Sequence, residues 1–63
     1  MTPTDRIIKA LRERAKMCQR NETAAARDRI WSAAWDWRVS GDAVAKMLST
    51  AIAIRDEEKA RKR

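Results

Sequence analysis

The chain has 63 residues and a mass of 7.3 kDa, and its 15 lysines and arginines against 9 aspartates and glutamates give a formal net charge of +6. Histidine is absent and Cys18 is the single cysteine, which excludes a four-ligand structural zinc site and an intramolecular disulfide. One glycine, one proline and 5% aromatic residues are too few for the turns and strands of a β-sheet protein, so the composition predicts an all-α chain.

The same features narrow the classes of function. No nucleophile–base pair is visible and so short a chain can hardly form a closed pocket, so we expect neither an enzyme nor a cofactor. No apolar run approaches the roughly 20 residues of a membrane span, and residues 1–5 lack the layout of a signal peptide. We therefore expect no membrane partner. Because a lone cysteine fits a reducing compartment, we expect a cytoplasmic protein.

In chain order, the first predicted element is a long helix over about residues 3–39. Thr2 is its expected N-cap, with Pro3 at the first helical position and Asp5 two residues later, and neither glycine nor proline occurs between Thr4 and Val39. Gly41 favours a turn at 40–42, because glycine readily adopts the left-handed conformation that ends a helix. A second, shorter helix is then expected over about 42–60, giving an antiparallel hairpin in a single helical domain that spans 1–63.

Apolar residues recur at helical spacing through this first helix without a phase jump, and the continuity favours one long helix. We call this set the main apolar stripe; its members are Ile8, Leu11, Ala15, Cys18, Ala26, Ala33 and Trp37. The alternative is a three-helix bundle in which Asn21 caps a new helix. In the hairpin with its turn at 40–42, the second helix is too short to cover the N-terminal part of the stripe. A chain of this length also has a marginal core. For both reasons we expect a homodimer. The residues predicted to form the core or the dimer interface are Ile8, Leu11, Ala15, Cys18, Ile30, Trp37, Val44 and Leu48.

A tryptophan-rich segment is the most distinctive candidate for binding a partner. Trp31 and Trp35 lie roughly opposite the main apolar stripe, and on a continuous helix Arg27 and Arg38 would stand within cation–π range of them. Tryptophan and arginine dominate the energetics of protein interfaces, so these four residues are the predicted partner-binding site. The competing interpretation is that the tryptophans form the core and the dimer interface of a chain with no other aromatic residue.

Basic residues concentrate in the first third of the chain. Arg6, Arg12, Lys16 and Arg20 form a predicted basic face that would contact phosphates, which makes a small nucleic-acid-binding regulator the alternative function. The same charges would also suit an acidic protein partner or a solvated surface.

Three segments follow one another in an order that is also seen in a known family: Thr4–Leu11, Arg27–Trp31 and the Gly41-Asp42 pair. In this layout the chain resembles the small quorum-sensing anti-activators of bacteriophages. The resemblance implies a homodimer of helical hairpins that binds host proteins in the bacterial cytoplasm. The implied targets are a LuxR-type transcription activator, blocked at its DNA-binding domain, and the ATPase that assembles type IV pili. We expect inhibition by occlusion of the partner, and the resemblance assigns no individual binding residue.

Overall fold

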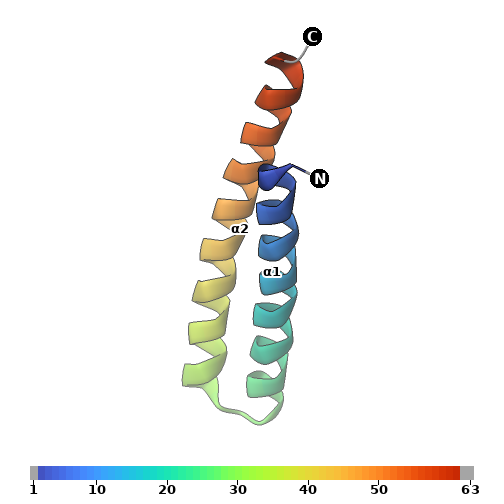
Figure 1. Ribbon diagram of the computed structural model, residues 1–63. Coiled ribbons are helices and arrows are strands. Elements are labelled where there is room, and N and C mark those ends of the chain that lie inside the picture. The colour runs from blue at the N-terminus through green and yellow to red at the C-terminus, as the bar shows by residue number, and fades with distance from the viewer. Residues whose placement is uncertain (1, 62–63) are drawn as a thin grey trace.

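The computed structural model describes residues 2–61 and contains two helices, α1 (Pro3–Arg27) and α2 (Trp31–Arg61), with no strand among these residues. The helices run antiparallel and side by side as a helical hairpin, and the C-terminal end of α2 extends past the start of α1 (Figure 1). The molecule is a rod with extents of 52 × 17 × 11 Å. The prediction of an all-α hairpin is confirmed.

The start of α1 follows the local rules of helix capping. The Thr2 hydroxyl accepts a hydrogen bond from the backbone N–H of Asp5 at 3.1 Å, and the backbone N–H of Thr2 donates to the Asp5 carboxylate at 3.3 Å. These reciprocal bonds form a capping box and satisfy two donors that a helix N-terminus otherwise leaves free. Pro3 occupies the first helical position, where its missing N–H costs nothing. The predicted cap is therefore confirmed.

The predicted boundaries after this point are wrong. The turn lies at residues 28–30, so α1 has 25 residues and is shorter than α2 with 31. The N–H of Ile30 bonds to the carbonyl of Ala25 at 2.9 Å and that of Arg29 to the carbonyl of Ala26 at 3.0 Å, which is the Schellman pattern of a helix C-terminus. Arg29 takes the left-handed conformation, with φ of 60°. The three-helix alternative is also wrong, because Asn21 lies inside α1.

Gly41, the predicted turn residue, lies instead within α2 and has no positive φ. A β-carbon at this position would stand 3.6 Å from Cβ of Cys18 on α1, an ordinary van der Waals distance. Gly41 therefore marks a close approach of the two helices and does not end one. The sequence misled here because the residue that adopts the left-handed conformation is an arginine, whereas glycine and asparagine are the usual residues at that position.

The two helices pack through residues spaced alternately three and four apart, the spacing of antiparallel helical bundles. On α1 the inward positions, all buried or half-buried, are Thr4, Ile8, Leu11, Ala15, Cys18 and Glu22. On α2 they are Ala34, Trp37, Gly41, Val44, Leu48, Ala51 and Arg55. The hydroxyl of Thr4 donates to the Glu58 carboxylate at 3.0 Å, so the pairing reaches the first turn of α1.

Most of the predicted core is confirmed. Ile8 and Cys18 are the most completely buried residues, at 2% and 1% exposure, and Val44 is buried with them. The remaining predicted residues that face inward are half-buried, namely Leu11, Ala15, Trp37 and Leu48. Ile30, predicted as a core or dimer-interface residue, is not in the core of the single chain, since it stands in the turn and is 52% exposed. The expectation that the N-terminal stripe lacks a cover within one chain is also wrong, because the earlier turn lets α2 run along all of it.

Candidate functional site

The three tryptophans occupy two different environments. Trp37 is half-buried and points to the interface with α1, where it lines a hollow with Cys18 and Gly41. Trp31 and Trp35, one helical turn apart at the start of α2, are 65% and 63% exposed. Trp31 and Trp35 are therefore not core residues of the single chain. Residues four apart share one face of a helix, and this face lies at the edge of the interface with α1.

The exposed tryptophans line a shallow hollow of about 330 Å³ close to the turn. Its other lining residues are Glu22, Ala26, Ala34 and Arg38. We call this surface the tryptophan hollow. It combines two large aromatic faces with one carboxylate and one guanidinium, so it offers apolar area together with a polar group of each sign. Such a mixture is typical of the residues that contribute most to a protein interface.

The structure separates Arg27 from this hollow. The sequence prediction placed Arg27 one turn before Trp31 on a continuous helix, but the turn at 28–30 interrupts that helix between them. Arg27 instead lines a different hollow, on the outer surface of α1, with Lys16 and Arg20. Arg38 keeps its predicted position three residues after Trp35, because both lie within α2. Three of the four predicted partner-binding residues are therefore brought together.

The predicted basic residues all lie on the exposed surface of α1. Lys16 and Arg20 line the hollow with Arg27, whose volume is about 740 Å³, while Arg12 lines a second one with Lys9 and Arg55. Arg6 is exposed on the same helix. The predicted basic residues are therefore all exposed, and no aromatic side chain is among the residues that line these two hollows.

One carboxyl group, that of Asp5 at the start of α1, has a shifted pKa. Hydrogen bonds from Thr2 hold the pKa of the Asp5 carboxyl below its ordinary value, and the charges of Arg55 and Lys59 act in the same direction. The shift follows from the capping box at the start of α1. Among residues 2–61 no three histidine, cysteine or acidic side chains gather as metal ligands would, and neither helix there has the length and apolarity to cross a bilayer.

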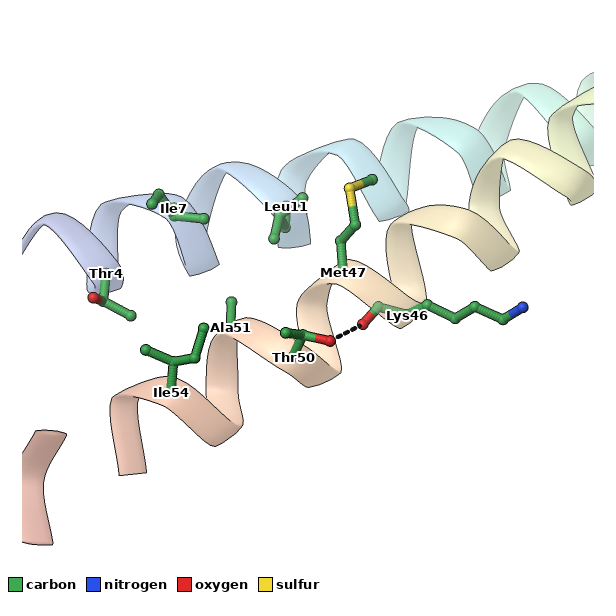
Figure 2. A pocket seen from close by; sticks show the side chains of 8 residues that line it. All are labelled: Thr4, Ile7, Leu11, Lys46, Met47, Thr50, Ala51 and Ile54. Atoms are coloured by element: carbon green, nitrogen blue, oxygen red, sulfur yellow. Dashed lines mark hydrogen bonds between the residues drawn. The ribbon is translucent and has the colours of Figure 1, made fainter. Parts of the chain in front are cut away.

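Sequence reasoning missed an apolar groove between the two helices at the end away from the turn. Its volume is about 550 Å³, and it is lined by Thr4, Ile7, Leu11, Lys46, Met47, Thr50, Ala51 and Ile54. Figure 2 shows Met47, Ala51 and Ile54 projecting from α2 toward Ile7 and Leu11 on α1. The signal in the sequence is the seven-residue interval between Met47 and Ile54, which places both on one side of a helix.

Comparison with known proteins gives no relative for this chain. No protein family matches the sequence, and neither the curated proteins nor the solved structures contain a match to it.

Proposed function

We propose that this chain is a small binding protein that blocks a partner protein by covering part of its surface, without any chemistry of its own. The observation that carries the proposal is the exposure of Trp31 and Trp35 beside Arg38 in the tryptophan hollow. Exposing two tryptophans on one face is unusual for a monomeric protein, whereas buried tryptophans are strong anchors of interfaces.

The proposed partner is a bacterial regulatory protein in the host cytoplasm. The resemblance to phage quorum-sensing anti-activators supports a LuxR-type transcription activator or the ATPase that assembles type IV pili as the target. In this proposal the chain is a homodimer of hairpins, so one dimer presents two tryptophan hollows to its partner. Occlusion needs only affinity and correct placement, which suits a short chain with no cofactor.

The test is capture of the partner from a nuclease-treated bacterial lysate by the wild-type chain, followed by titration of the purified partner. Trp35→Ala and Arg38→Ala should each weaken binding by about 2 kcal/mol, roughly thirty-fold, because truncation of a central interface residue has that size of effect. Val39→Ala is the matched control, since Val39 is exposed on the same helix but outside the hollow. Circular dichroism should stay helical for all three variants, and equal binding by all three would refute the assignment.

The alternative function is a nucleic-acid-binding regulator, which the hollow lined by Lys16, Arg20 and Arg27 supports. Phosphate contacts release counterions, so the logarithm of affinity for duplex DNA should fall by about 0.9 per contact for each tenfold increase in salt. Lys16→Ala and Arg20→Ala should each reduce that slope by roughly one. Affinity that does not respond to salt would exclude this alternative.

A further inference from the structure

One face of the hairpin remains apolar and uncovered after the two helices have packed on each other. Next to the last five inward positions of α2, from Gly41 to Arg55, runs a second set of residues, each one place earlier in the sequence, with the same alternating spacing of three and four. Its members, all exposed, are Ser40, Ala43, Met47, Thr50 and Ile54, and we call this set the outer stripe. The outer stripe borders the apolar groove, which adds Ile7 and Leu11 of α1. A helix with two adjacent stripes is typical of a bundle with more than two helices.

The surface area of the chain indicates how much is left to cover. The hairpin exposes 5266 Å². A globular monomer of its mass, 7.3 kDa, exposes about 4,200 Å² by the usual scaling. The excess of about 1,100 Å² is close to the roughly 800 Å² that each partner contributes to a specific interface of standard size. The radius of gyration, 14.8 Å, likewise exceeds the value of about 11 Å expected for a compact domain of this length.

We infer that a second copy of this chain covers this face, so that two hairpins form an antiparallel four-helix bundle with Met47 at the two-fold axis. The inference rests on the dimer of the proposed function and names the face and the register that this dimer uses. In this register Ser40 lies opposite Ile54 of the other copy and Ala43 lies close to its Thr50, so small side chains meet larger ones. Ile7 and Leu11 then pack against α2 of the other copy.

The distribution of charged residues also favours a second copy of this chain on this face. From Ser40 to Ile54 the outer stripe has no charged residue, so the centre of the interface buries no charge, while the same series continues to Asp36 nearer the turn. The only charged side chain that lines the groove is Lys46. The tryptophan hollow remains free in the dimer, because Trp35 lies about 120° around α2 from Met47. The dimer face and the partner-binding face are therefore separate surfaces.

The experiment measures the mass of the full-length chain in solution by sedimentation equilibrium. Wild type should be a dimer, and Met47→Glu should raise the dimer dissociation constant by roughly a hundredfold, because the interface would bury an unpaired charge. Ser49→Glu is the matched control. Ser49 is exposed and lies two residues further along α2, hence on the opposite side of the helix, so this variant should dimerise as wild type does. Added salt should leave the wild-type dimer intact or tighten it, because salt screens the repulsion between two cationic chains.

A second measurement keeps the inference testable if Met47→Glu unfolds the chain. Under mild oxidation, Met47→Cys should form a disulfide-linked dimer, because a residue on a two-fold axis meets its own copy. Ser49→Cys should not form one, and wild type should not either, because Cys18 is buried. A monomeric wild type at about 100 μM would overturn the dimer and the face together. A dimer that tolerates Met47→Glu, or equal cross-linking of both cysteine variants, would overturn the face alone. Partner binding lost in Trp35→Ala tests the tryptophan hollow and is independent of these results.

Discussion

Replacing Gly41 by alanine tests where the chain turns. Gly41 lies within α2 and has no positive φ, so alanine is compatible with its backbone. Alanine in a helix interior is more favourable than glycine by about 1 kcal/mol, mostly because glycine loses more conformational freedom on folding. The added β-carbon would meet Cβ of Cys18 at 3.6 Å, a normal contact that requires no movement. We therefore expect Gly41→Ala to stabilise the protein by about 1 kcal/mol, which raises the melting temperature by roughly 4–8 °C in a domain of this size.

The measurement is thermal unfolding followed by circular dichroism at one fixed chain concentration, because the apparent stability of a dimer depends on concentration. Gly41→Leu is the control for packing. Its side chain would extend beyond a β-carbon that already touches Cys18, and overpacking of this kind costs about 1–3 kcal/mol. A lower melting temperature for Gly41→Ala would refute the reasoning. It would indicate a glycine with positive φ at the turn, where alanine costs about 1–2 kcal/mol.

Three further predictions concern the turn, the cap and the core. Arg29→Gly should stabilise the protein by about 1 kcal/mol, because glycine adopts the left-handed conformation of residue 29 without strain. Urea unfolding measures this, and an unchanged free energy of unfolding would contradict the Schellman turn. Stability should fall as pH decreases through the lowered pKa of Asp5, because the native state favours the ionised carboxylate, while Asp5→Asn should flatten this acid limb of the stability–pH profile. Ile8→Ala should cost about 3 kcal/mol and remove much of the helical signal, and a well-folded variant would show that Ile8 is not central to the core.

Part of the candidate site could be predicted from local spacing. Trp31 and Trp35 are four residues apart and out of phase with the main apolar stripe, and both are exposed in the structure. Arg38 follows in the same helix and lines the same hollow. A continuous helix would place Arg27 beside them, and the turn at 28–30 separates it from them. The apolar groove could not be found in this way, because it depends on which residues of α1 lie opposite Met47 and Ile54.

The sequence by itself determined the helical content, the capping box at Thr2 and Asp5, and the burial of Ile8, Cys18 and Val44, because these depend on composition and on spacing within a few turns. Only the tertiary structure decided the position of the turn. A glycine inside α2 and an arginine in the left-handed conformation each cost about 1 kcal/mol, so local preferences favour a turn at Gly41. A turn at 28–30 lets α2 cover α1 from Thr4 to Glu22, whereas a turn at 40–42 would leave Ile8 and its neighbours exposed. Burial of a single isoleucine is worth about 1.5–3 kcal/mol, so the packing of the two helices outweighs both local costs.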